Sequence, residues 1–174
     1  KDTTIYLDAL GIKVIEVYGL TETASIGTIN LLTDYSKIDS VGQPLPNVDI
    51  QLSSVNEILI SCNSLLQNYC SKNVALELIK GKKYLRTGDI GSIDEDGFLF
   101  ITGRLNEQIK LQNGTWLMPQ EVENDLIRIS EDQFNCVVVL MNNYKLTAIV
   151  VTDLDSRLVQ LIIDKFNNNG FIYI

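Results

Sequence analysis

The residues best suited to chemistry in this sequence lie between residues 84 and 123. A glycine turn ending at Asp89 is followed, after a short hairpin, by Gly103 and Arg104. Asp89 is an acceptor-only carboxylate that can take two hydroxyl donors, and Arg104 offers a planar fork of N–H donors. Such a pair suits a ribose and a phosphate. The same residues would also serve as a turn-capping Asp and a surface Arg, because Asp and Gly favour turns.

A second polar loop follows a segment that alternates like a strand, residues 13–17, and ends at Tyr18 and Gly19. Loops at strand ends are a usual place for ligand-binding groups in α/β sheets. Thr21 offers a hydroxyl to a phosphate, Glu22 a hard oxygen ligand for Mg²⁺, and Tyr18 a flat ring on which a base can stack. A Thr-rich turn with a solvated Glu22 is the alternative that this loop leaves open.

The composition excludes several classes of function. The 174 residues carry 14 Lys and Arg against 22 Asp and Glu, a net charge of -8, so the electrostatics that sustain nucleic-acid binding are missing. The absence of histidine removes Ser-His and Cys-His pairs and most transition-metal sites. Cys62, Cys70 and Cys136 show no CxxC pair, which argues against zinc or a disulfide framework. Chemistry must use carboxylates, hydroxyls, Lys, Arg and a hard cation.

The apolar runs of the sequence are short. Those at residues 136–141 and 147–151 are far below the length that spans a membrane, and the N-terminus lacks the layout of a signal peptide. We therefore expect an intracellular protein without a transmembrane segment, either cytoplasmic or peripheral on an internal membrane.

The elements that must position these loops are short strands with few helices. Before Tyr84 the patterns predict a helix from Thr3 to Leu10, strands at 26–32, 48–52 and 57–60, and a weak helix at 74–79 ended by Gly81. After it, strands at 90–93 and 98–102 flank an Asp-Gly hairpin turn. Asn106 breaks the apolar pattern, and we place a domain boundary there.

The last third of the sequence reads as a small α+β module. Pro119 suits the first turn of a helix with an acidic start and a buried stripe of Val122, Leu126 and Ile129. Strands at 135–141 and 146–152 follow, and then a helix capped by Ser156. The expected fold class of the whole chain is α+β.

Several strings fall in one order and at one spacing that resembles the adenylate-forming enzymes, over roughly residues 5–155. They are Tyr18-Gly-Leu-Thr-Glu-Thr23, Val41-Gly-Gln-Pro-Leu-Pro46, Glu57-Ile-Leu-Ile60, Tyr84-Leu-Arg-Thr-Gly-Asp89, and Gly103-Arg104 followed by Ile109-Lys-Leu-Gln-Asn-Gly114 and Pro119-Gln-Glu-Val-Glu123. Within that superfamily, the Lys-Leu-Gln-Asn-Gly run is similar to long-chain acyl-CoA synthetases.

The resemblance implies a two-step ligase. ATP and a fatty acid would give an acyl adenylate and pyrophosphate, and the thiol of coenzyme A would then displace AMP. The implied nucleotide-binding residues are Tyr18, Gly19, Thr21, Asp89 and Arg104. The implied catalytic residues are Thr21, Glu22, which would hold Mg²⁺, and Lys110, which the thioester-forming state would present near the nucleotide. Asn106 falls at the hinge, where Asp or Lys is usual, although Asn tolerates uncommon backbone angles.

The family's Ser/Thr/Gly-rich phosphate loop and its adenylation lysine do not occur in the sequence. We therefore expect a fragment of an acyl-CoA synthetase: residues 1–105 as the β-rich C-terminal portion of the large AMP-binding domain and residues 106–174 as a truncated, mobile small domain. The fragment alone should be inactive. An aryl- or amino-acid-adenylating relative and a non-catalytic module that binds nucleotide or protein remain alternatives, and peripheral membrane association stays open.

Overall fold

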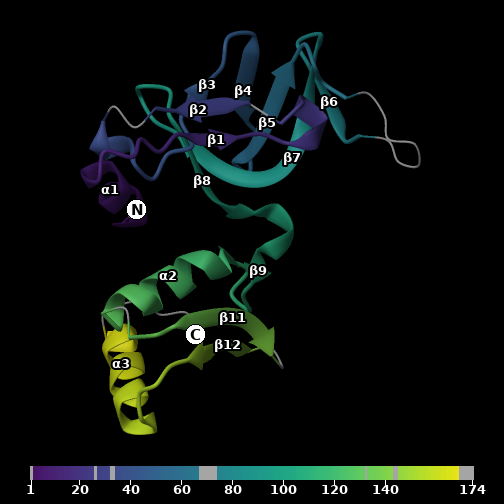
Figure 1. Cartoon of the computed structure of the whole chain (residues 1–174). Helices are drawn as coiled ribbons and strands as arrows, with labels where there is room; N and C mark the ends of the chain where they lie inside the picture. Colours follow the sequence, from purple (N-terminus) through teal and green to yellow (C-terminus); the bar gives the residue numbers. More distant parts are fainter. Residues whose placement is uncertain are drawn as a thin grey trace. The chain divides into compact units, whose positions relative to one another are not determined.

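The computed structural model of the chain describes residues 2–25, 27–31, 34–66, 74–131, 133–142 and 145–168. Contacts divide the chain into two compact units, Lys1–Leu105 and Asn106–Ile174, called unit 1 and unit 2 here. Each unit combines helical segments with antiparallel strands (Figure 1), so the expected α+β class is confirmed. Within the ranges given above, every helix is too short or too polar to cross a membrane.

Unit 1 contains two antiparallel sheets. Its elements are α1 (Asp2–Ala9), β1 (Glu16–Tyr18), the 3-10 helix η1 (Thr21–Thr23), β2 (Thr28–Asn30), the 3-10 helix η2 (Tyr35–Lys37), β3 (Gln43–Pro44), β4 (Val48–Leu52), β5 (Glu57–Cys62), β6 (Leu76–Ile79), β7 (Lys82–Ile93) and β8 (Leu99–Arg104). In the described part, the smaller sheet has the order β1-β2-β3. The larger has the order β4-β5-β7-β6, and β8 also pairs with β7.

The core of unit 1 is centred on β5. Residues 57–61 of this strand are all buried, because β4 and β7 flank it in the sheet and both of its faces are covered. Ile58, Ile60 and Leu99 form the buried cluster, and Tyr18 packs against it. The loop that follows β1 is therefore anchored to the same core as β5 and β8.

The two sheets of unit 1 meet at a seam formed by Gly42 and Leu99. The Leu99 amide donates to the Gly42 carbonyl, and the Val41 amide donates to the Leu99 carbonyl, both at 2.9 Å. The Ser40 hydroxyl donates to the same Leu99 carbonyl at 2.7 Å. Gly42 has a φ of +95°, and a Cβ there would lie 1.9 Å from the carbonyl oxygen of Ile29. The seam therefore requires glycine.

Unit 2 packs helices onto a two-stranded sheet (Figure 1). Its elements are the 3-10 helix η3 (Leu105–Glu107), which begins at the last residue of unit 1, β9 (Ile109–Lys110), β10 (Trp116–Leu117), α2 (Pro119–Ile129), β11 (Cys136–Asn142), β12 (Lys145–Val151) and α3 (Ser156–Asn168). Val122 and Leu126 of α2 share one buried cluster with Val137 and Val139 of β11. The expected helix start at Pro119 and the two expected strands are confirmed.

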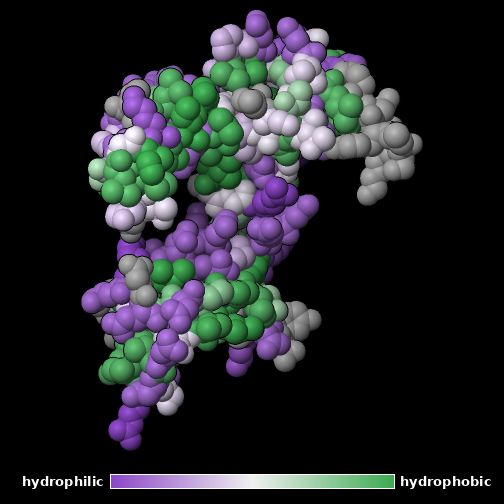
Figure 2. Space-filling model, viewed as in Figure 1, coloured by the Kyte–Doolittle hydropathy of each residue, from purple (hydrophilic) through white to green (hydrophobic). Residues whose placement is uncertain are grey.

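The strands β11 and β12 bury only one face. Val137 and Val139 point to the core, and the intervening Val138 is 45% exposed, as the two-residue period of a strand requires. Its partner across the ladder, Ile149, is 54% exposed. Figure 2 shows apolar residues at the surface over these two strands. The second face is therefore an open apolar surface.

The expected helix at residues 74–79 is wrong: Leu76–Ile79 is the strand β6. It pairs with β7, where Leu76 lies opposite Leu85. Lys80 and Gly81 both have positive φ, 49° and 81°, the backbone of a tight hairpin turn. Gly81, interpreted as a helix stop, is thus a hairpin residue, and pairing with β7 overrides the weak helix preference of the sequence.

Two smaller expectations also change. The strand expected at residues 13–17 begins only at Glu16. The α3 helix is capped by Asp155, whose carboxylate accepts from the amides of Arg157 and Leu158 at 2.8 and 3.0 Å, and not by Ser156. Asp and Ser are both good cap residues, so their order in sequence could not distinguish them. Ile26, Leu32 and Cys70 lie outside the described residues.

Candidate functional site

The Asp89 turn is a bulge in the middle of the larger sheet. β7 pairs with β5 through Arg86 and Ile90, whose partners are Leu59 and Glu57. A single residue separates the partners on β5, whereas residues 87–89 separate Arg86 from Ile90 on β7. Residues 87–89 therefore drop out of the β5–β7 ladder. Such bulges bend a strand and redirect its side chains.

Side chains replace the backbone bonds that the bulge loses. Gly88 has a φ of +75°, and its amide donates to Oε1 of Glu57 at 3.1 Å. The Thr87 hydroxyl donates to the carbonyl of Ile58 at 2.8 Å and accepts from the Asp89 amide at 3.0 Å. The bulge is therefore tied to β5 at two adjacent points, one of them a carboxylate.

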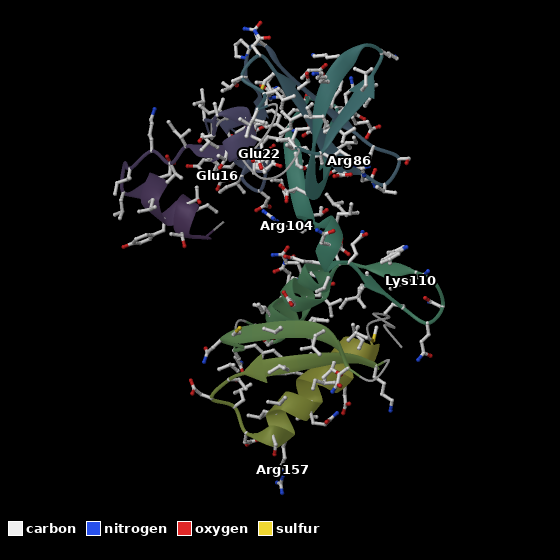
Figure 3. All side chains as sticks on the ribbon, turned by 90° about the vertical axis from the view of Figure 1, so that its right-hand side faces the viewer. Glu16, Glu22, Arg86, Arg104, Lys110 and Arg157 are labelled. Atoms are coloured by element: carbon white, nitrogen blue, oxygen red, sulfur yellow. The ribbon has the colours of Figure 1, made fainter. Side chains whose placement is uncertain are left out.

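The structure brings three of the expected site residues together around one carboxylate. The Tyr18 hydroxyl donates to Oδ2 of Asp89 at 2.7 Å, and Nε of Arg104 lies 3.1 Å from Oδ1. Asp89 and Arg104 are also direct partners in the β7–β8 ladder. Asp89 is only 5% exposed, whereas the side chain of Arg104, at the end of β8, is 63% exposed (Figure 3). Arg104 therefore forms the open side of this network.

Tyr18 is a permanent hydrogen-bond donor in the network. Burial, and next the hydrogen bond to Asp89, raise the pKa of its phenol well above the ordinary value of 10.0. The hydroxyl therefore keeps its proton at every physiological pH. A carboxylate has about four acceptor positions. Tyr18 and Arg104 each occupy one at Asp89, which leaves acceptor capacity for two further donors.

The loop after β1 is a tight helical turn. Gly19 lies between Tyr18 and η1, where Thr21 is exposed and Glu22 is half-buried. Thr23 is buried, and its hydroxyl exchanges hydrogen bonds of 3.0 Å with the backbone of Leu20. Thr23 thus holds the turn closed, and the Thr21 hydroxyl is exposed at its surface.

Glu22 fits a shared metal site but not one made by protein groups alone. No group of three or more His, Cys, Asp or Glu able to hold a metal occurs in the part of the chain that the structure describes. Mg²⁺ is commonly held by one or two carboxylates with substrate phosphates completing its shell. A single carboxylate such as Glu22 is compatible with that arrangement.

The remaining expected site residues belong to the stretch after Leu105. Asn106 is exposed in η3, at the point where the two units divide. Lys110 is exposed on β9, opposite Trp116 in the β9–β10 hairpin, and its Nζ lies 5.5 Å from the centre of the indole ring (Figure 3). Such a separation permits a cation–π contact. The ammonium is thus held at the end of a short hairpin.

Glu57 and Arg86 are parts of the site that sequence reasoning missed. Both stand inside strings that carry the family resemblance, but neither received a role. The available signal was a carboxylate at the start of an otherwise apolar strand, because such a residue is rarely buried without a partner. The guanidinium of Arg86 bonds to Oε2 of Glu57 through Nε at 2.9 Å and through its second terminal nitrogen.

Comparison with known proteins agrees with this geometry. The chain is 34% identical over 116 residues to the long-chain-fatty-acid–CoA ligase FadD15 of Mycobacterium bovis, covering 67% of the chain and 19% of that protein. It is 34% identical over 139 residues to the 2-succinylbenzoate–CoA ligase of Lactococcus lactis, covering 75% of the chain and 28% of that protein. No family model matches the chain. The chain thus spans less than a third of the length of these relatives.

The fold is shared with solved ligase structures. The O-succinylbenzoate coenzyme A synthetase of Bacillus subtilis in complex with AMP superposes with a TM-score of 0.74 at 22% identity, covering 94% of this chain and 37% of that one. Relatives and structural neighbours are alike AMP-forming ligases, matched over their C-terminal part. The chain belongs to the superfamily of adenylate-forming, AMP-forming ligases.

Proposed function

We propose that the chain is the C-terminal part of an AMP-forming acyl-CoA ligase and that the Tyr18–Asp89–Arg104 network binds the ribose of its nucleotide. The network carries the proposal because its carboxylate is buried, fixed by two donors, and still able to accept from two vicinal hydroxyls. Charge-assisted bonds of this kind are stronger than neutral ones. The AMP complex of the Bacillus subtilis neighbour supports a nucleotide as the ligand.

The reaction that fits these groups proceeds in two steps. The carboxylate of the acid attacks the α-phosphorus of ATP, pyrophosphate leaves, and the thiol of coenzyme A then attacks the acyl carbon and releases AMP. In the first step Asp89 orients the ribose, Thr21 donates its hydroxyl to a phosphate oxygen, and Glu22 supplies a carboxylate ligand to Mg²⁺. When bound, Mg²⁺ would supply positive charge to the phosphates, with Glu22 as the residue that would hold it.

Unit 1 is proposed as the end of the large AMP-binding domain and unit 2 as the small mobile domain. The proposal is supported by the division of the chain between Leu105 and Asn106. Asn106 would be the swivel, and Lys110 would reach the nucleotide during thioester formation.

The proposed acid is a long-chain fatty acid. This choice rests on the run from Lys110 to Gly114 and on the similarity to a long-chain-fatty-acid–CoA ligase. A second candidate is an aryl acid such as 2-succinylbenzoate. It is favoured by the 2-succinylbenzoate–CoA ligase, which is as similar to this chain, at 34% identity, as the fatty-acid ligase. ATP–pyrophosphate exchange by the whole enzyme with fatty, aryl and amino acids separates the two. Exchange with fatty acids alone supports the first candidate, and exchange with aryl acids alone contradicts it.

The ribose site is tested with nucleotides that lack its hydroxyls. Calorimetric titration should show that the chain binds AMP more tightly than 2′,3′-dideoxy-AMP, and that Asp89→Ala removes this preference. Asp49→Asn is the matched control, because Asp49 is also an ion-paired carboxylate of the larger sheet but lies outside the network. Equal binding of the two nucleotides by the unaltered chain would contradict the ribose assignment.

A further inference from the structure

Glu57 is a charged residue in the most buried strand of unit 1. It is 2% exposed and stands directly before the core residues Ile58 and Ile60. Burying a carboxylate is costly, and an apolar residue of the same size often serves stability as well or better. Its ion pair with Arg86 does not by itself explain the charge, because the Arg86 side chain is 44% exposed and could be hydrated instead.

The two carboxylate oxygens of Glu57 have different partners. Oε2 accepts from the guanidinium of Arg86, and Oε1 accepts from the amide of Gly88. Arg86 is the last ladder residue before the bulge, and Gly88 is its middle residue. One side chain therefore fixes both the entry and the centre of the segment that ends at Asp89. Asp94 is partnered in a similar way, with Lys37 at Oδ2 and the amides of Asp96 and Phe98 at Oδ1, but it is 25% exposed and those amides belong to its own hairpin turn.

The bulge needs such a support because of its glycine. Glycine visits positive and negative φ with similar ease, so the backbone at Gly88 has no intrinsic preference for its φ of +75°. The Glu57 bond selects one of these conformations. Since Asp89 follows directly, a different φ at Gly88 would turn its carboxylate away from Tyr18 and Arg104.

We propose that Glu57 is a positioning residue for the nucleotide site, which holds the Arg86–Gly88 backbone so that the Asp89 carboxylate faces the ribose. This inference rests on the proposed function. Glu57 does not touch the nucleotide and acts on Asp89 through the Gly88 amide. Its acceptor oxygen at Gly88, and not its charge, is the property that the site requires.

Two substitutions separate the acceptor from the charge. Glu57→Gln keeps an oxygen that can accept from the Gly88 amide, whereas Glu57→Met has a similar volume and no such acceptor. Removing one partner of an ion pair is costly when the remaining charge stays buried, but the Arg86 side chain is 44% exposed and can be hydrated, so the Met variant should fold. We expect the Met variant to bind AMP about ten-fold more weakly, because it loses the one hydrogen bond that positions Gly88. The AMP affinity of the Gln variant should stay within about three-fold of the unaltered protein. Asp49→Asn is the control and should leave AMP affinity unchanged.

A double substitution tests whether Glu57 acts through Asp89. In an Asp89→Ala background, Glu57→Met should cause no further loss of AMP affinity, because there is no carboxylate left to orient. Independent, additive losses would overturn the inference. So would equal losses in the Gln and Met variants, or a loss that follows the melting temperature, since those results would indicate a purely structural role.

Amide hydrogen exchange reads the positioning without any nucleotide. Exchange at Gly88 should be about ten-fold faster in Glu57→Met than in Glu57→Gln, with amides of β4 and β6 unaffected. Unchanged exchange at Gly88 would overturn the inference whatever the nucleotide data show. If the unaltered protein does not bind AMP, the proposed function fails, and the exchange data still decide whether Glu57 holds the bulge.

Discussion

Unit 1 buries charge and hydroxyl groups, whereas unit 2 buries almost only hydrocarbon. Glu57, Asp89 and Thr23 of unit 1 are all buried, and each is hydrogen-bonded within its own unit. Among the described residues of unit 2, Ser130 is the one buried polar side chain. The difference matches the proposed division of roles: the candidate site of unit 1 lies within its sheet, whereas Asn106 and Lys110 are exposed in unit 2, whose core is apolar.

The largest expected effect is a loss of stability when the core of unit 2 is changed. Leu126 is 4% exposed in the cluster of α2 and β11, so Leu126→Ala should lower the free energy of unfolding of unit 2 by about 2–5 kcal/mol. Denaturant unfolding followed at Trp116 measures it. Val138→Ala on the open face is the control and should cost under about 0.5 kcal/mol. A matching loss of AMP affinity in the folded Leu126 variant would contradict the separation of roles.

The next largest effect belongs to the carboxylate of unit 1. Asp89→Ala should weaken AMP binding by on the order of 2–4 kcal/mol, because two ribose hydroxyls lose a charged acceptor. Calorimetry with AMP measures the change, and Asp49→Asn serves again as the control. Unchanged AMP affinity in the Asp89 variant would show that the network has a structural role only.

A substitution at Asn106 tests the boundary between the two kinds of unit. Asn106→Pro fixes φ near -65°. In the whole enzyme we expect adenylate formation and thioester formation to change by factors that differ about ten-fold, or ~1.4 kcal/mol in activation free energy, because only one domain orientation tolerates the fixed angle. Rapid-quench timing of each half-reaction decides it, and equal changes in the two steps would show that Asn106 is not a swivel.

Removing one donor from the network should have a smaller effect. Tyr18→Phe keeps the aromatic ring and deletes the bond to Asp89, so AMP affinity should fall by about 0.5–1.5 kcal/mol. The AMP affinity of Tyr18→Leu should fall further, because the aromatic ring is lost as well. If the Phe and Leu variants bind AMP equally, stacking on Tyr18 contributes nothing and that assignment is wrong.

The smallest expected effect concerns an ion pair away from the site. Hydrogen bonds from Lys82 and then from Tyr84 hold the pKa of Asp49 below its ordinary 3.8. A lowered pKa in the folded state stabilises the fold above that ordinary value, and the benefit disappears as the pH falls through the folded value. Below about pH 4, the free energy of unfolding of Asp49→Asn should therefore fall less with acid than that of the unaltered protein, by under about 1 kcal/mol. A steeper loss of stability with acid in the variant would contradict the stabilising role of the Asp49 carboxylate.

The sequence indicated which side chains of unit 1 suit a binding site but not the backbone that directs them. The Asp94–Gly97 turn indicated that Asp89 and Arg104 lie near one another on β7 and β8, but a register shift between Ile90 and Gly91 makes them direct partners. The bulge at residues 87–89 was not predicted, because it depends on Glu57 in a different strand. Local patterns report periodicity along one segment and carry no information on which distant group satisfies a particular amide.

The same limit explains where the elements were wrong. In unit 2 an amphipathic helix and two alternating strands were predicted correctly because their apolar stripes face one core. In unit 1, β6 was taken for a helix because Leu and Glu are good helix formers, although over four residues this preference is small against pairing with β7 across a hairpin. The weaker the local preference, the more the outcome depends on tertiary pairing.

The seam at Gly42 and Leu99 has a consequence for how unit 1 folds. It joins residues far apart in sequence, so its hydrogen bonds form only after a long loop closes, and closing such a loop is entropically unfavourable. Tyr18 belongs to the sheet on one side of the seam, and Asp89 and Arg104 to the sheet on the other. The Tyr18–Asp89–Arg104 network should therefore be among the last parts of unit 1 to assemble, after each sheet has formed its own local hairpins.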